Sequence, residues 1–180
     1  PARLGLAGAV SGGARVSQAG EASAERAESM RIVGDLFIRA VNGMVGLTTI
    51  DQGRRLAHAE GKRDSFQLVV EQPSRFRPGG LYELRFHVEG EGDATSLRLS
   101  RRLVHPDRMR RGLGKVIYRD IDPEDQKLLL ENVAVRFGYF GPRNRRGEPR
   151  WHDDWDGLWG PPFLVRMQIA DAGGHWPEFV

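Results

Sequence analysis

The sequence predicts an α+β fold in which one long N-terminal amphipathic helix packs on antiparallel β-sheet. Two observations lead to this class. Helical periodicity covers about residues 17–46, and an alternation with period two dominates about residues 64–170. A helix that precedes a run of strands favours a helix laid on antiparallel sheet, and no ligand crevice of the parallel-sheet kind is implied. This order favours an assembly component over an enzyme.

The helix is predicted from an apolar stripe with steps of three and four residues. Arg31, Asp35 and Arg39 lie four residues apart on the polar side, where alternating charges can pair. Ile38 falls among these polar positions and is a candidate partner contact. Gly43 and Gly46 offer positions at which the helix can end. The stripe itself is expected to contact the sheet and contains Met30, Val33, Phe37, Val41 and Met44.

The strands are predicted from alternating apolar and polar residues. Leu84, Phe86 and Val88 alternate with polar neighbours, and a turn after residue 90 leads into 95–104, which predicts a hairpin. Residues 133–139 and 163–169 repeat the pattern, with Phe163 assigned to the inward face of the last strand. Residues 48–63 and 141–160 are expected to be loops, and residues 116–118 a short strand. Leu128–Leu130 fits either a strand or the end of a helical turn.

Composition is that of a folded protein of 180 residues with 39% hydrophobic residues. We expect a flexible leader at residues 1–16 and a single domain at 17–180. The chain has no cysteine, which excludes disulfides and thiolate chemistry, and no apolar run long enough to span a bilayer. It begins with proline, so we expect either a processed form or an expressed fragment, with an N-terminal anchor cut away.

Catalytic, cofactor and metal motifs are not found, so no catalytic residue, cofactor or metal ligand is assigned. The acidic segment His152–Asp156 has oxygen ligands that calcium accepts, but its spacing does not match an EF-hand, and a solvated loop is the simpler interpretation. Tryptophans at 151, 155 and 159 leave open a binding module for a sugar or peptide. Net charge is only +3 and acidic residues interrupt the arginine clusters, so nucleic acid is not expected as a partner.

Three stretches in order resemble the J-type minor pseudopilins of type II secretion. The first is Glu25–Leu36, a polar segment with arginine that leads to an Asp-Leu pair. The second is Leu129–Tyr139, where leucines lead through a valine-containing turn into an aromatic strand. The third places Trp151 and Trp155 before the final strand Pro162–Ile169. The apolar anchoring helix of the family has no counterpart here, and a type IV minor pilin is the nearest alternative.

The resemblance implies a pilin-like fold and a non-enzymatic role without cofactors. It implies a periplasmic head, attached to the inner membrane of a Gram-negative bacterium only through an anchor absent from this sequence. The implied partners are the I-type and K-type minor pseudopilins at the pseudopilus tip, and the major pseudopilin is a further possible partner. The surface of the helix is the expected interface, with charges selecting the partner. Its candidate residues are Arg31, Asp35, Ile38, Arg39 and Asn42.

Overall fold

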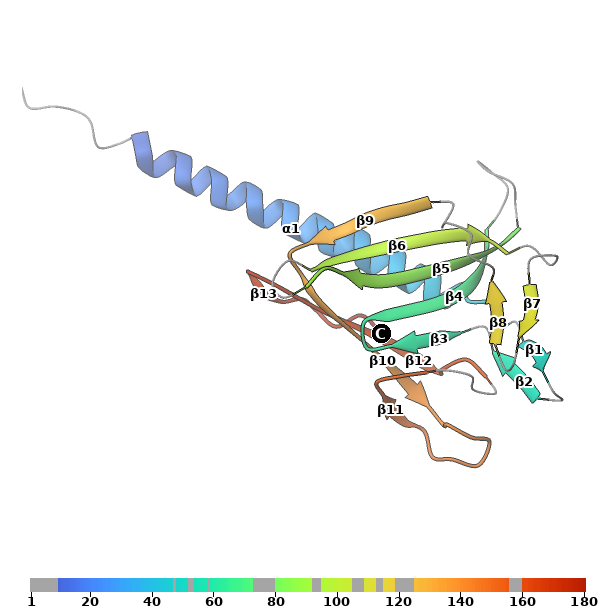
Figure 1. Cartoon of the computed structure of the whole chain (residues 1–180). Coiled ribbons are helices and arrows are strands. Elements are labelled where there is room, and N and C mark those ends of the chain that lie inside the picture. Colours follow the sequence, from blue (N-terminus) through green and yellow to red (C-terminus); the bar gives the residue numbers. More distant parts are fainter. Residues whose placement is uncertain are drawn as a thin grey trace, which may run out of the picture. The chain divides into compact units, whose positions relative to one another are not determined.

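The computed structural model contains one N-terminal helix followed by antiparallel strands (Figure 1). It describes residues 10–46, 48–51, 54–57, 59–72, 80–91, 95–104, 109–112, 115–118, 125–155 and 160–180. The chain forms two compact units, Pro1–Asp35 and Leu36–Val180. Every strand pair among the described residues is antiparallel, so the predicted α+β class is confirmed.

Helix α1 spans Val10–Asn42, and its first part makes up the described portion of the N-terminal unit. The predicted start at residue 17 is too late, and residues 10–16 of the expected leader are helical; the rest of the leader lies outside the described residues. No proline interrupts residues 2–42, and alanine, glutamine, arginine and glutamate between residues 14 and 28 favour helix. The helix therefore extends N-terminal to residue 17.

The end of α1 differs from the prediction as well. The helix ends at Asn42 rather than near residue 46, and neither Gly43 nor Gly46 has a positive φ angle. Met44 forms a β-bridge with Val70, and the Val45 amide donates to the Val69 carbonyl at 2.8 Å. The helix stops because the next residues pair with a strand, which satisfies their backbone groups.

A five-stranded sheet forms the first layer of the C-terminal unit. The hairpin predicted from residues 84–104 is confirmed as β5 and β6, with Gly90 at a φ of 109° in the connecting turn. Leu128–Leu130 belongs to a strand, β9, and not to a helical turn. The sheet order is β3 (Glu60–Lys62), β4 (Ser65–Gln72), β5 (Gly80–Glu89), β6 (Ser96–Leu103) and β9 (Asp125–Glu131).

A four-stranded sheet forms the second layer. Its two long strands pair with Phe137 opposite Met167, and the short strands extend it on either side. The predicted loop 141–160 contains β11, and β12 begins at Leu164, so Phe163 precedes the strand and is exposed rather than inward. The sheet order is β11 (Arg150–His152), β10 (Ala134–Gly141), β12 (Leu164–Asp171) and β13 (Gly174–His175).

Two further hairpins correct the predicted extent of the strands. Residues 48–63 were expected to be a loop, but they hold β1, β2 and β3, and the strand region extends from Thr48 to His175 rather than from about 64 to 170. Threonine and isoleucine in residues 48–50 suit a strand. The expected strand at 116–118 is confirmed within β8. The hairpins are β1 (Thr48–Asp51) with β2 (Arg54–Ala57), and β7 (Met109–Gly112) with β8 (Lys115–Tyr118).

Phe37, on the last turns of α1, lies at the centre of the core of the C-terminal unit. Its ring meets Phe86 of the first sheet edge-on at 5.7 Å and Phe137 of the second sheet at 6.3 Å. Phe66 continues the cluster, 6.5 Å from Phe137 and 5.6 Å from Tyr139. The inner faces of both sheets therefore meet the same helix residue. Among the described residues, no helix combines the length and apolar character needed to cross a bilayer.

Candidate partner interface

The last turns of α1 present the predicted contact Ile38 directly beside the core residue Phe37. Phe37 is fully buried, whereas Ile38 is 38% exposed and Arg39 and Asn42 are also exposed. One residue step turns a side chain by about 100° around a helix, so the residue after a core position faces away from the core. The predicted exposure of these three residues is thereby found in the structure.

Arg31 and Asp35 belong to the N-terminal unit, where Glu28 joins them. Arg31 donates to Glu28 at 2.6 and 2.9 Å but reaches Asp35 only at 3.5 Å. The hydrogen bond from Arg31 lowers the pKa of Glu28, and the same bond raises the pKa of Arg31. The main partner of Arg31 is thus Glu28, a residue that the sequence analysis did not assign.

Ile32 is a second exposed apolar residue of the helix, at 48%. Ile32 is not among the predicted contacts, because it lies between Arg31 and the stripe residue Val33. Helical periodicity does predict the exposure of Ile32, because a residue next to a stripe position is directed away from the stripe, as Ile38 is next to Phe37.

The tryptophan segment divides into a buried and an exposed residue. Trp155 is 1% exposed and donates through Nε1 to the Gly160 carbonyl at 3.0 Å. Its backbone pairs with Gly61 of β3, through hydrogen bonds of 2.6 and 2.8 Å. Trp151 lies on β11 and is 39% exposed, and Trp159 lies outside the described residues. Because Trp155 joins the two sheets, it is not available as the platform of a binding module.

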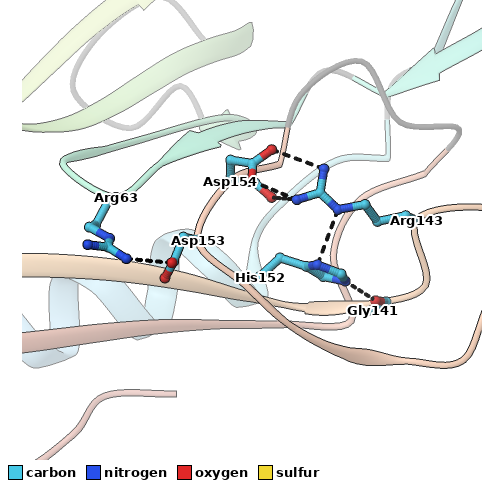
Figure 2. Close-up of polar contacts among 6 residues, drawn as sticks. All are labelled: Arg63, Gly141, Arg143, His152, Asp153 and Asp154. Carbon is cyan, nitrogen blue, oxygen red and sulfur yellow. Dashed lines mark hydrogen bonds and ion pairs between the residues drawn. The ribbon is translucent and has the colours of Figure 1, made fainter.

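Two arginines engage the acidic segment that was considered for calcium (Figure 2). Arg143 donates to both carboxylate oxygens of Asp154, at 2.6 and 3.0 Å, and Arg63 donates to Asp153 at 2.5 Å. The hydrogen bond from Arg143 lowers the pKa of Asp154. These two carboxylates are therefore neutralised within the protein, and Asp156 lies outside the described residues. In the described part of the chain, no group of three histidine, aspartate or glutamate residues could hold a metal.

His152 is held in the same cluster. Arg143 Nε donates to His152 Nδ1 at 3.1 Å, and His152 Nε2 lies 3.0 Å from the Gly141 carbonyl oxygen. An arginine can only donate, so Nδ1 accepts and the imidazole proton is on Nε2, where it bonds to the carbonyl. The cluster fixes the chain on both sides of β11.

A polar hollow of about 220 Å³ lies on the outer face of the first sheet. Glu83 is buried there, accepts from Gln67 Nε2 at 2.9 Å and forms an ion pair with Arg102. His87 lines the hollow and its Nδ1 lies 3.4 Å from the Arg85 carbonyl oxygen. The carboxylate is thus compensated by neighbours on adjacent strands, as a buried charge requires.

A known protein is similar to most of this chain. No family model matches the chain. The chain is 28% identical over 170 residues to type II secretion system protein J of Xanthomonas campestris pv. campestris. The aligned region covers 92% of this chain and 76% of that protein. The resemblance to the J-type minor pseudopilins is confirmed.

This similarity supports a minor pseudopilin role in type II secretion. Pseudopilins are a family of structural, non-enzymatic subunits, so the surfaces that can meet other subunits become the relevant ones. The structure divides the predicted set between the two units, with Arg31 and Asp35 in one and Ile38, Arg39 and Asn42 in the other.

Proposed function

We propose that this protein is the periplasmic head of a J-type minor pseudopilin with a pilin-like fold. In this proposal, an apolar N-terminal helix of the kind found in the family holds it in the inner membrane. The head assembles with the I-type and K-type minor pseudopilins, and the major pseudopilin is a further candidate partner at the point where this tip joins the rest of the pseudopilus. The observation that carries the proposal is the similarity to type II secretion system protein J along 92% of the chain.

The exposed face of α1 is the proposed interface, comprising Arg31, Asp35, Ile38, Arg39 and Asn42. Ile38 supplies apolar area that a partner helix can cover, and Arg39 and Asn42 lie within one turn of it. The Glu28–Arg31 pair adds a fixed charge pattern in the N-terminal unit. Charged rims mainly select the partner and speed association, whereas a central apolar residue contributes more of the affinity. We add Ile32 to this set because of its exposure.

The test is assembly of the purified chain with I-type and K-type heads, measured by light scattering after size exclusion. We expect a complex with the wild-type chain and a loss of affinity of roughly tenfold or more for Ile38→Glu. Leu128→Glu is the matched control, because Leu128 is also 38% exposed but lies on β9. Absence of any complex with the wild-type chain, or equal loss in both variants, would contradict the proposed interface.

A further inference from the structure

The outer face of the second sheet carries an exposed apolar row that the core does not use. Phe140 of β10 pairs with Trp151 of β11 on one side and with Leu164 of β12 on the other. Residues directly opposite each other in a sheet share a face, so these three side chains form one continuous row. Phe137 and Tyr139, which alternate with this face, are buried in the core. The row therefore lies on the side of the sheet away from Phe37 of α1.

This row is unusually exposed for apolar side chains. Leu164 is 45% exposed and Trp151 39%, and Phe163, the neighbour of Leu164 in the chain, is 58% exposed. Phe140 is half-buried, with its ring 5.4 Å from that of Trp151. Single exposed apolar residues need no explanation, but a contiguous group of aromatic and aliphatic side chains marks an interaction surface.

The sheet also holds Trp151 in place before any partner binds. The Arg166 guanidinium lies over the Trp151 ring at 4.4 Å from its centroid, a cation–π contact. Gly138 makes room for that guanidinium, since a Cβ at this position would lie 3.1 Å from Arg166 Nε. Glycine in the middle of a strand costs stability and marks a close approach of another group. An aromatic ring already fixed in one orientation loses little entropy on binding.

The charge around the row selects the kind of partner. Exposed Arg136 lies on the same outer face, and the loop after β10 contributes the exposed residues Arg145 and Arg146. Of the acidic residues nearby, Glu148 is exposed in the loop, Glu178 pairs with Arg166 at 3.6 Å, and Asp153 and Asp154 after β11 pair with Arg63 and Arg143. Tryptophan and arginine are the residues most enriched at binding hot spots.

We propose that this aromatic face, defined by Phe140, Trp151, Leu164 and Arg166 with Arg136 beside them, binds an acidic polypeptide segment that carries an apolar anchor. The anchor packs on Trp151 and Leu164 while the acidic groups of the segment face the arginines. Electrostatic complementarity of this kind steers the encounter, and the apolar contact supplies the affinity. The face shares no residue with the proposed helix interface.

The test uses fluorescein-labelled peptides and the whole chain, with binding measured by fluorescence anisotropy. The probe peptide has aspartate and glutamate on both sides of a central Phe-Leu pair. One control peptide replaces its acids by lysine, and a second replaces Phe-Leu by Ser-Ser. We expect binding of the probe peptide only, and weaker binding at higher salt because exposed charges are screened. No binding of the probe at up to ~1 mM, or equal binding of the lysine peptide, overturns the proposal.

Variants locate the binding on the face. Trp151→Ala and Leu164→Ser are each expected to lower the affinity for the probe peptide by roughly tenfold. Leu164→Ser changes an exposed side chain, so it keeps the test valid if Trp151→Ala unfolds. Leu128→Ser on β9 and Arg85→Gln on β5 are the controls for apolar exposure and for charge, and should bind as the wild type does. Unchanged binding in Leu164→Ser, or equal loss in the controls, contradicts the assignment.

The wild type and the same variants also test two other occupants of the face, a second copy of the chain and a lipid surface. Sedimentation velocity of the wild type alone should show a monomer; a concentration-dependent dimer that Trp151→Ala abolishes would make a second copy of the chain the occupant and overturn the proposal. Vesicles of anionic phospholipid should not bind through this face. Vesicle binding that Leu164→Ser abolishes would replace the acidic polypeptide by a membrane surface.

Discussion

The backbone of Gly61 lies directly against the ring of Tyr139. A Cβ at Gly61 would lie 2.1 Å from Tyr139 Cζ, and the Tyr139 hydroxyl lies 2.8 Å from the carbonyl oxygens of both Lys62 and Ser65. Tyr139 is on β10 of the second sheet, while these carbonyls flank the β3–β4 turn of the first. One buried tyrosine thus ties the two sheets together, and it can do so only because position 61 has no side chain.

Gly61→Ala is therefore expected to destabilise the C-terminal unit. The added methyl group must displace a buried aromatic ring, and overpacking of this kind costs about 2–3 kcal/mol. Urea unfolding followed by circular dichroism measures the loss. Gly20→Ala is the matched control, because no atom lies within 4 Å of a Cβ there; in a helix that change should be neutral or stabilising by up to ~1 kcal/mol. An equal effect in both variants would contradict the close contact.

Tyr139→Phe removes the hydroxyl and keeps the ring. We expect a loss of about 1–2 kcal/mol in the free energy of unfolding, because two part-buried carbonyls lose the single hydroxyl proton that they share. Burial raises the pKa of Tyr139 well above its usual 10.0. When the pKa of a group is higher in the folded than in the unfolded protein, its contribution to the stability of the fold is complete below the unfolded-state pKa. The contribution decreases as the pH rises towards the folded-state pKa. The difference between wild type and Tyr139→Phe should therefore stay constant up to about pH 10 and shrink above it. A difference that already shrinks near neutral pH would contradict this environment.

Phe37 and Ile38 give a pair of adjacent helix residues with opposite roles. Phe37→Ala should cost about 3–5 kcal/mol, because Phe37 contacts both Phe86 and Phe137 in the core. Ile38→Ala should change stability by no more than ~0.5 kcal/mol, since Ile38 is exposed. Chemical denaturation of the two variants side by side checks the assignment of the helix faces. Comparable losses in both would mean that the core-facing stripe is wrongly placed.

Periodicity was sufficient to predict the helix stripe and the alternating strands. Phe37 and Phe86 could be assigned to the core because their spacing repeats with the period of their own element. β3 was not predicted, because the reason for a glycine at position 61 is its contact with Tyr139, which lies 78 positions further along the chain. The burial of Trp155 likewise depends on Gly61 and on the room that Gly141 leaves, where a Cβ would lie 2.7 Å from the indole. Contacts between residues so far apart leave no local pattern.

The two candidate surfaces also differ in whether a local sequence pattern could predict them. Exposure of Ile38 followed from its place on the polar side of the helix, but the aromatic face could not be predicted. Phe140 and Leu164 share the outward parity of Arg136 and Arg166 on their strands, which was visible in the sequence. That they form one row with Trp151 depends on the register of β10 with β11 and β12, and a sequence pattern on a single strand does not fix register.

The bidentate pair of Arg143 and Asp154 predicts a specific dependence of stability on pH. Arg143 lowers the pKa of Asp154 from its ordinary 3.8, so the carboxylate stabilises the folded protein above that value and loses its effect as pH falls through the folded pKa. Both side chains are at least 40% exposed, so solvent screening limits the gain to about 0.5 kcal/mol. Asp154→Asn should thus be less stable than wild type by about that amount at pH 7 and equal to it near pH 2.

Urea unfolding at the two pH values measures the Asp154→Asn difference, and the Arg143→Gln background supplies the control. Without the guanidinium, the carboxylate loses most of its gain from ionisation in the folded state, so Asp154→Asn should change the pH dependence much less. If it changes the pH dependence equally in both backgrounds, a group other than Arg143 lowers the pKa of Asp154. In that case the pair would not be what holds the segment around β11, and Trp151 would owe its position on the aromatic face to Arg166 and the strand pairing alone.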